Sequence, residues 1–266
     1  MAGRYTQAEI DRFVEDFTRD SFCILRQQLP IAKIREWQRA FEPLLQRHIV
    51  GQGALQNRGS ARYYVTLPFT APFSDPRFYE DDDVLAIVER VAGEGFTMVQ
   101  LASDTPLRGS DYQELHRDAP PLFPEWGRET PSFQIAVNFP LVDVTEQNGP
   151  FEVVRGTHMM SKRVAMEKIE AGELKLEPVL LKAGDVMIRD VRHIHRGTPN
   201  RTDEPRPMIV IGYSRKWLLR PEVHIRIPRV EWERASERAK KMLRTNPVVD
   251  SLDLKDKAEV YQSFAY

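Results

Sequence analysis

The strongest fold signal in the chain is AGDVMIRDVRHIHRGTPNRTDEPRPMIVIGY, which occupies residues 183–213. A Gly-Asp turn leads into an apolar run that ends at His195, and Arg206 opens a second apolar run. The connection between the two runs carries Gly, Pro and Asn, the residues that commonly separate neighbouring strands in antiparallel proteins. The stretch therefore predicts two strands joined by a polar loop.

The same alternation of short β-rich runs and turn residues extends over residues 96–217. The runs are FTMVQLA, FQIAVNFPLVDV, FEVVRG, LEPVLL, DVMIRDV and MIVIGYS. This pattern is typical of an antiparallel sandwich or barrel. The Pro-rich residues 104–132 and the Gly-rich, basic residues 51–62 are expected to form loops. Because loops at the mouth of such a barrel carry specificity, 104–132 and 51–70 are candidate lids.

Helical patterns precede and follow the β-rich part. Residues 7–17 and 31–45 carry apolar side chains at helical spacing, and 84–91 indicate one more short helix. Residues 21–28 indicate a short strand, and 230–244 return to helix. We predict an α+β protein with a mainly β core, in which helices buttress the β structure. The predicted organisation is a single domain over residues 1–266, with the β core at about 96–217, a helical N-terminal part at 1–95 and a helical C-terminal extension at 218–266.

The bulk composition is ordinary for a globular protein. The 266 residues are 41% hydrophobic, and 38 Lys and Arg nearly balance 39 Asp and Glu. Without an excess of positive charge, we expect no nucleic-acid partner and no binding to an anionic membrane. The single cysteine, Cys23, excludes an intramolecular disulfide and a cysteine-rich zinc site. Charged residues occur within the first dozen positions, and no run approaches the ~20 apolar residues of a membrane span. A cytoplasmic location is therefore expected.

His116 and Asp118, in the sequence H-R-D, form a candidate metal site. In an extended segment residues i and i+2 project to the same face, so the imidazole and the carboxylate can hold one ion. A second imidazole from a distant strand would complete the two-histidine, one-carboxylate triad of non-haem iron(II) oxygenases. His193 and His195 compete for that place, because they also stand at i and i+2. The residue pattern alone does not choose between them.

Arg206 is a candidate for binding an acidic co-substrate. Its planar guanidinium makes two parallel charge-assisted hydrogen bonds to a carboxylate, which lysine cannot do, and so suits the distal carboxylate of a 2-oxo diacid. Without a metal site upstream, Arg206 would be read as an ordinary surface residue of a strand. Other arginines of the candidate lids could recognise an anionic substrate, although solvated surface charge is the commoner role for any one of them: Arg58, Arg62, Arg108 and Arg128.

Three segments that carry these residues resemble the phytanoyl-CoA dioxygenase family of iron(II)- and 2-oxoglutarate-dependent oxygenases. The segments are QELHRD at 113–118, NFPLVDVTEQNGPFEVVRGTH at 138–158 and GDVMIRDVRHIHRGTPNRTDEPRP at 184–207. They occur in the family's order, and the resemblance covers roughly residues 7–217. It implies a double-stranded β-helix, which is a jelly-roll or cupin-like fold, with iron(II) at its open end.

The resemblance also implies roles for individual residues. It selects His195 as the second histidine, because the R-G-T-P-N that follows and Arg206 match the family's register. Arg206 would then bind 2-oxoglutarate, and Gln113 and Asn138 would contact 2-oxoglutarate or support the metal ligands. Related halogenases carry a small residue at the position of Asp118. A carboxylate there favours hydroxylation or another oxidation over halogenation.

The expected activity is oxidation, most simply hydroxylation, of a C–H bond in a small-molecule substrate. Iron(II) would be the metal, 2-oxoglutarate and O2 the co-substrates, and succinate and CO2 the by-products. One rival is a catalytically silent jelly-roll protein that binds a metal or small molecule as a sensor. The other is a zinc hydrolase, for which no H-E-x-x-H motif is present. The C-terminal helical part could pack on a second copy, so a homodimer is also considered.

Overall fold

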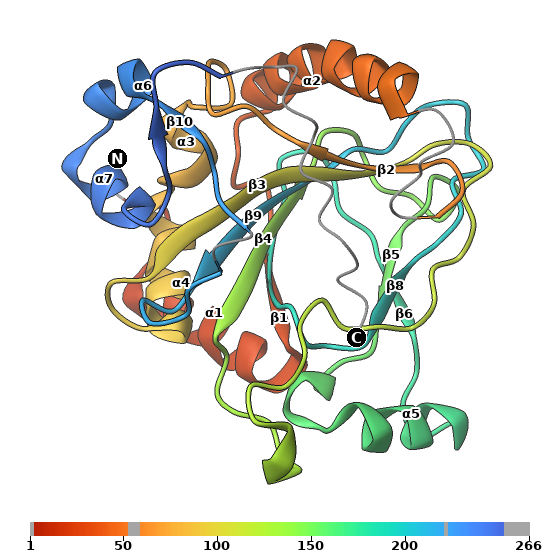
Figure 1. Cartoon of the computed structure of the whole chain (residues 1–266). Coiled ribbons are helices and arrows are strands. Elements are labelled where there is room, and N and C mark those ends of the chain that lie inside the picture. Colours follow the sequence, from red (N-terminus) through yellow and green to blue (C-terminus); the bar gives the residue numbers. More distant parts are fainter. Residues whose placement is uncertain (1–2, 53–58, 221–222, 253–266) are drawn as a thin grey trace.

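Two antiparallel sheets face each other in the computed structural model, which describes residues 3–52, 59–220 and 223–252 (Figure 1). The main sheet has six strands in the order β1 (Phe22–Leu25), β7 (Val186–Asp190), β4 (Gln134–Pro140), β9 (Met208–Ser214), β3 (Thr97–Pro106) and β2 (Arg62–Thr66). The small sheet has the order β6 (Glu177–Val179), β5 (Phe151–Val153) and β8 (His195–Gly197). The expected mainly β, jelly-roll core is confirmed.

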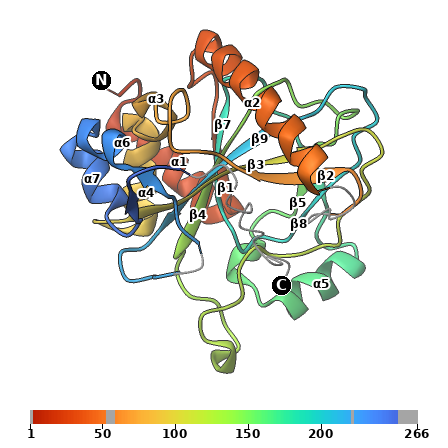
Figure 2. The ribbon, with the colours of Figure 1, turned by 45° about the horizontal axis from the view of Figure 1, so that its top comes forward.

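The helices cover the outer face of the main sheet. They include α1 (Gln7–Asp20), α2 (Ile31–Gln52) and α4 (Asp82–Ala92), and Figure 2 shows α2 running across the strands. Helix α1 begins at a capping box, in which the Thr6 side chain accepts from the Glu9 amide and the Glu9 carboxylate accepts from the Thr6 amide. Its buried residues Ile10 and Phe17 join the core beneath the sheet.

The two faces of the main sheet differ in polarity. On β4 the odd-numbered residues Ile135, Val137 and Phe139 are buried in the apolar core against the helices. The even-numbered residues of β4 from 134 to 138 project the other way, because side chains alternate along a strand. They line a cavity between the two sheets, and this face carries amide and charged groups. The alternation therefore separates a packing face from a face equipped with polar groups.

Three expectations about element boundaries need correction. Strands β1 and β2 belong to the main sheet, although both precede the β core expected at 96–217. Because β2 begins at Arg62, the 51–70 segment is in part an edge strand and not a continuous lid loop. The helix expected at 230–244 is broken at Ala235, where the backbone is extended and Ser236 caps a new helix by accepting from the Ala239 amide. The part of the expected C-terminal extension from 253 onward lies outside the described residues.

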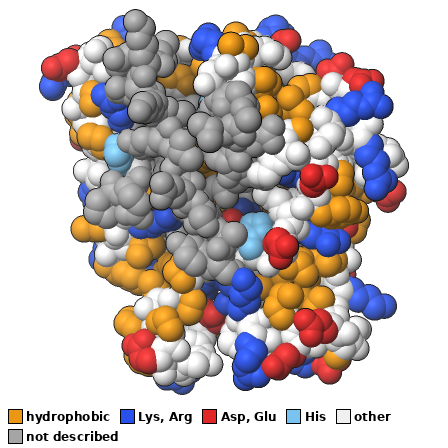
Figure 3. All heavy atoms as spheres, turned by 45° about the vertical axis from the view of Figure 1, so that its right-hand side comes forward, with side chains coloured by type: hydrophobic (Ala, Val, Ile, Leu, Met, Phe, Trp, Pro, Cys, Tyr) orange, Lys and Arg blue, Asp and Glu red, His pale blue; other side chains and the backbone are white. Residues whose placement is uncertain are grey.

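The remaining elements are short. They are α3 (Pro76–Tyr79), α5 (Lys162–Glu170), α6 (Arg229–Arg234), α7 (Glu237–Leu243), the parallel pair β10 (Ile227–Pro228) and β11 (Val248–Val249), and 3-10 turns at Pro124–Trp126 and Thr157–Met159. Within the described ranges, no helix combines the length and apolar character that crossing a membrane would need. On the face drawn in Figure 3, basic, acidic and hydrophobic side chains of the described residues are interspersed, without a patch of one sign.

Candidate metal centre

Backbone pairing brings the two halves of the candidate metal site together. The segment carrying His116 lies antiparallel to β8, and the His116 amide donates to the His195 carbonyl at 3.0 Å. The His195 amide donates back to the His116 carbonyl at 3.1 Å. The Asp118 amide donates to the Val191 carbonyl at 2.9 Å, which fixes the carboxylate on the same side as the two imidazoles. Residues almost 80 positions apart in sequence are thereby held in register.

The three side chains converge on one point. The Nε2 atoms of His116 and His195 lie 3.7 Å and 3.5 Å from Oδ1 of Asp118, and the three ligand atoms lie within 4.8 Å of one another. Each Nδ1 faces a backbone carbonyl, Glu114 O at 2.7 Å for His116 and His193 O at 3.0 Å for His195. Because a carbonyl can only accept, each Nδ1 carries the proton and each Nε2 presents a lone pair. The tautomers are therefore those that bind a metal through Nε2.

The electrostatics favour a neutral His116 beside an ionised Asp118. Burial, together with the neighbouring His195, lowers the pKa of His116 to about 4, so its imidazole is neutral at physiological pH. Burial by itself would raise the pKa of the Asp118 carboxyl. The opposing effects of His195 and the Arg189 guanidinium outweigh burial and hold that pKa well below its usual range. The group thus offers at least one neutral imidazole beside a carboxylate.

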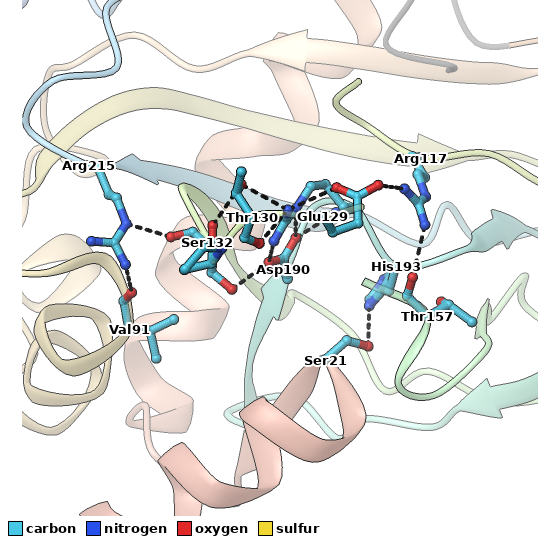
Figure 4. Close-up of polar contacts among 12 residues, drawn as sticks. Ser21, Val91, Arg117, Glu129, Thr130, Ser132, Thr157, Asp190, His193 and Arg215 are labelled. Atoms are coloured by element: carbon cyan, nitrogen blue, oxygen red, sulfur yellow. Dashed lines mark hydrogen bonds and ion pairs between the residues drawn. The ribbon is translucent and has the colours of Figure 1, made fainter. Parts of the chain in front are cut away.

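His193, the alternative to His195 in the sequence pattern, points elsewhere. Its Nδ1 is hydrogen-bonded to Ser21 Oγ at 3.1 Å (Figure 4). Its ring packs edge-on against Phe22. Burial and the nearby His195 keep the pKa of His193 well below its ordinary value. The structure therefore groups His195, and not His193, with His116 and Asp118.

Arg189 is a site residue that the sequence reasoning missed. Its Nη2 donates to Oδ2 of Asp118 at 2.7 Å, and its Nε donates to Oδ1 of Asn138 at 3.0 Å. The Asn138 amide in turn donates to the Ile209 carbonyl at 3.1 Å. Asn138 thus lines the cavity, and its hydrogen bonds orient Arg189, which in turn orients Oδ2 of Asp118. The sign of this role in the sequence was Arg189 itself, a charged residue that follows the apolar residues of the strand VMIRD and lies on its cavity side.

Gln113 also lines the cavity, and its amide group is used within the protein. Its side-chain Oε1 accepts from the backbone amide of Gly197 at 2.9 Å, and the backbone amide of Gln113 donates to the Gly197 carbonyl at 3.0 Å. These two bonds tie the segment before His116 to the end of β8. Gln113 therefore contributes to the pairing that brings the histidines together.

Arg206 lies at one end of the same cavity. It is 2% exposed, and its Nη2 donates to the Gly149 carbonyl at 2.7 Å. Its Nε is buried without a partner, and no carboxylate of the described residues lies within ion-pair distance. Burial, with a contribution from nearby Arg62, lowers the pKa of Arg206 to about 10, so the guanidinium stays charged at neutral pH. A buried, uncompensated cation is costly, and an anionic ligand would neutralise it.

The four arginines of the candidate lids have different positions. Arg62 is not surface charge: it is 1% exposed, pairs with Asp104 at 2.9 Å and donates to the Thr198 carbonyl at 2.7 Å. Arg108 is exposed and paired with Asp203, and Arg128 is exposed beside an aromatic ring. Arg58 lies outside the described residues.

A network of buried charges surrounds Arg117, the residue between His116 and Asp118 (Figure 4). Glu129 accepts from Arg117 at 2.5 Å and from Arg192 at 3.1 Å. Arg192 also donates to Asp190 at 2.8 Å, and Ser132 Oγ donates to the same carboxylate at 2.6 Å. The four charged side chains are at most 3% exposed. Because Arg117 stands between the two ligands of H-R-D, the network anchors the end of the Pro-rich segment to the backbone that carries them.

We expect Glu129→Gln to destabilise the protein by about 3 kcal/mol, because removing one partner of a buried ion pair leaves uncompensated charge. The midpoint of thermal unfolding should fall by roughly 6–12 °C for a chain of this size. Calorimetry or urea titration measures the change. Glu125→Gln, an exposed glutamate of the same segment, is the matched control and should leave the midpoint unchanged. Equal midpoints for the two variants would contradict the role given to the network.

Comparisons with known proteins agree with this geometry. The sequence profile of the family described as phytanoyl-CoA dioxygenase (PhyH) matches residues 17–208. The chain is 25% identical over 232 residues to the dioxygenase FUM3 of Gibberella moniliformis (strain M3125 / FGSC 7600). That alignment covers 81% of this chain and 75% of FUM3.

Two solved structures share the fold. The α-ketoglutarate-dependent epimerase SnoN from nogalamycin biosynthesis, solved with Fe³⁺, α-ketoglutarate and nogalamycin RO, has a TM-score of 0.61 and 20% identity over 79% of this chain and 85% of SnoN. HygX from Streptomyces hygroscopicus, solved with nickel, 2-oxoglutarate and hygromycin B, has a TM-score of 0.59 and 15% identity over 80% of this chain and 89% of HygX. At these identities the likeness is one of fold.

Proposed function

This chain belongs to the phytanoyl-CoA dioxygenase family, and from that premise we propose that it hydroxylates a C–H bond of a small-molecule substrate. It is a non-haem iron(II)- and 2-oxoglutarate-dependent dioxygenase, with O2 as the second co-substrate. The observation that carries the proposal is the group of His116, Asp118 and His195, in which two Nε2 atoms face one carboxylate oxygen and both Nδ1 atoms are held by backbone carbonyls.

We assign His116, Asp118 and His195 as the iron ligands. Imidazole and carboxylate donors in this combination suit non-haem iron(II), and three protein ligands leave positions for other molecules. The carbonyl partners of both Nδ1 atoms support the assignment, because metal-binding histidines normally have their second nitrogen held in this way. Bound iron supplies the redox chemistry that couples decarboxylation of 2-oxoglutarate to oxidation of the substrate. The chain's own residues set the geometry and exclude water.

We assign Arg206 to the distal carboxylate of 2-oxoglutarate. Its unpaired Nε and its lack of a carboxylate partner among the described residues support this role. Arg62 cannot take the role as readily, because its guanidinium is already paired with Asp104. Gln113 and Asn138 border the co-substrate end of the cavity, where their side chains hold the surrounding backbone and Arg189 in position.

We propose hydroxylation because Asp118 provides a carboxylate at the position where related halogenases carry a small residue. The likeness to SnoN, which is described as an epimerase, makes product analysis the deciding step. Mass spectrometry of the oxidised product should show the gain of one oxygen atom derived from ¹⁸O2. An epimer or a ring with no added oxygen would replace hydroxylation by that reaction.

Purified protein given iron(II), ascorbate and 2-oxoglutarate should form succinate at a slow substrate-free rate. Chelation of the metal should abolish succinate formation, and iron(II) should restore it while zinc should not. Anaerobic addition of 2-oxoglutarate to the iron(II) protein should produce a charge-transfer absorption band. Metal binding without any succinate or band would instead favour a catalytically silent binding protein.

A further inference from the structure

Arg189 retains unused hydrogen-bond donors beside the metal centre. It is 7% exposed and lines the cavity, where Nε donates to Asn138 and Nη2 donates to Asp118. Two of the five N–H groups of the guanidinium are used in this way, which leaves three without an acceptor in the described chain. Both N–H groups of Nη1 are among these three, because Nη1 is buried without a partner. A buried polar group in this state costs on the order of 1–3 kcal/mol.

The side chains next to Arg189 do not supply the missing acceptor. Phe22 of β1 and Ala136 of β4 are its partners in register on the two neighbouring strands, and neither side chain has a polar atom. The ring of Phe151 lies 5.1 Å from the guanidinium carbon and stabilises the cation through its face, without replacing a hydrogen bond to oxygen. The unused donors therefore indicate a ligand that brings acceptor oxygens.

The positive charge of Arg189 is only partly compensated when iron is bound. Asp118 is its ion-pair partner among the described residues, through Oδ2 at 2.7 Å. The other oxygen of the same carboxylate, Oδ1, faces the two histidine Nε2 atoms and is assigned to iron(II). A single carboxylate then lies between two positive charges. An additional anion next to Arg189 would relieve the repulsion between them.

The charges around the whole cavity agree with this. Three arginines and two aspartates of the described chain line it, so the protein contributes one excess positive charge; they are Arg62, Arg189, Arg206, Asp104 and Asp118. The two histidine ligands count as neutral, because a metal-bound nitrogen must be deprotonated. Iron(II) adds two positive charges and 2-oxoglutarate adds two negative charges, so the excess stays at one. Buried net charge is costly, and a substrate with one negative charge removes it.

The unused donors of Arg189 are separate from the guanidinium assigned to 2-oxoglutarate. Arg189 pairs with Ala136, which pairs with Gly212 of β9, whereas Arg206 precedes the other end of β9. From Met208 to Gly212 the strand advances about 13 Å, at roughly 3.3 Å per residue. Asp104 and Arg62 are the charged groups that influence the pKa of Arg206, and Arg189 is not among them. The two arginines therefore serve different parts of the cavity.

Gln134 offers a further donor on the same wall of the cavity. It stands two residues before Ala136 on β4, is 5% exposed and faces the cavity. Its side-chain amide has no hydrogen-bond partner among the described residues. A carboxylate has two oxygens with about four lone-pair sites, so it can accept from a guanidinium and from an amide at the same time.

The rest of this wall is apolar. Ala136, Val191 and Val210 face the cavity and belong to one buried apolar cluster. Leu122 and Leu218, which are partly buried, pack against the same cluster. An apolar molecular framework gains free energy by burial against such a wall. A ligand with one carboxylate on an apolar framework therefore matches both the donors and the wall.

We propose that Arg189 binds the carboxylate of a monocarboxylic acid substrate beside the iron centre, with Gln134 as a second donor. The inference rests on the proposed function and names the substrate class of that same site. It separates this chain from an enzyme that acts on acyl-CoA thioesters, because the phosphates of such a thioester carry several negative charges where the described lining leaves one to be neutralised.

The test compares monocarboxylic acids with the primary amides that share their carbon skeleton, for example phenylacetic acid with phenylacetamide and decanoic acid with decanamide. Calorimetry without oxygen measures their binding to the protein loaded with iron(II) and 2-oxoglutarate, and succinate formed above the substrate-free rate measures turnover in air. Acids should bind about tenfold or more tightly than their amides, because the amide loses the charge-assisted hydrogen bonds. Acyl-CoA thioesters should bind no more tightly than the amides.

Substitutions then tie this preference to Arg189. Arg189→Gln keeps a planar polar group but removes the charge, and the ratio of acid to amide affinity should fall to near one. Because the ratio is taken within one variant, a change in iron affinity affects both compounds alike. Arg201→Gln, an exposed arginine, is the matched control and should keep the wild-type ratio. Gln134→Leu leaves the pairing of Arg189 with Asp118 in place and should weaken binding of the acid about tenfold.

Four results would overturn the inference. They are equal binding of acids and amides by the wild-type protein, no binding of any acid of the panel, an unchanged ratio in Arg189→Gln, and an effect of Arg189→Gln confined to the half-saturating concentration of 2-oxoglutarate. The last result would assign the guanidinium to the co-substrate. Each of them leaves the substrate-free succinate and the 2-oxoglutarate absorption band of the wild-type protein in place. Failure of the proposed function is recognised separately, because the wild-type protein would then show neither.

Discussion

Asp118→Ala is expected to abolish substrate oxidation and to lower iron(II) affinity by at least 100-fold. Oδ1 of Asp118 faces the Nε2 atoms of His116 and His195, so the substitution removes the only anionic ligand of the group. Changes to residues that merely support metal ligands already cost 10–100-fold in metal affinity, and removing a ligand should cost more. The substitution also leaves the Arg189 guanidinium buried without its carboxylate, which repels a cation at the same place. Anaerobic iron(II) titration and succinate release measure the two effects.

Two further variants separate the loss of the ligand from a general disturbance. Asp118→Asn keeps the volume and an oxygen for Arg189 but removes the charge, and it too should lose most of the iron affinity. Asp111→Ala changes an exposed carboxylate of the same segment and should bind iron(II) like the wild-type protein. If Asp118→Ala binds iron(II) as tightly as Asp111→Ala does, Asp118 is not a ligand.

The pairing of His116 with Asp118 could be predicted because it depends on local geometry. Residues at i and i+2 of an extended segment project together wherever that segment lies. The choice between His193 and His195 is not local, since both satisfy the same spacing. It depends on Ser21, which is distant in sequence and whose hydroxyl holds the His193 ring away from His116 and Asp118. Only the family resemblance pointed to His195 from the sequence.

The burial of Arg62 and Arg189 could not be recognised from the sequence. A charged residue is usually exposed, and each of these is buried only because a partner lies far along the chain. Arg189 meets Asp118 across 71 positions, and Arg62 meets Asp104 across 42. Strand β2 was missed for a related reason, since its five residues follow a Gly-rich stretch and are stabilised by pairing with β3. Sheet membership of so short a run is set by its neighbour and not by its own composition.

Arg206→Ala is expected to raise the half-saturating concentration of 2-oxoglutarate by about 30-fold or more. Truncating one member of a buried, hydrogen-bonded charge pair costs on the order of 2–5 kcal/mol, and each 1.4 kcal/mol corresponds to about tenfold in affinity. Arg206→Lys should recover only part of the loss, because lysine keeps the charge but lacks the planar fork. Succinate formation measured against 2-oxoglutarate concentration gives the values. Arg201→Ala, an exposed arginine of the same connection, is the control.

The stability of a further variant, Arg206→Met, provides an independent test of the role of Arg206. Wild-type Arg206 is buried with its Nε unpaired and no carboxylate partner in the described part of the chain, so its charge destabilises the protein in the absence of 2-oxoglutarate. Arg206→Met should therefore raise the unfolding midpoint of the co-substrate-free protein. A ligand that binds only the folded state stabilises it in proportion to its affinity, so 2-oxoglutarate should raise the midpoint of the iron(II)-loaded wild-type protein more than that of the variant. The contrary result is an Arg206→Met variant with a lower unfolding midpoint than the wild-type protein in the absence of 2-oxoglutarate and an equal rise of the midpoint when 2-oxoglutarate is added. It would mean that Arg206 packs the core and does not bind the co-substrate.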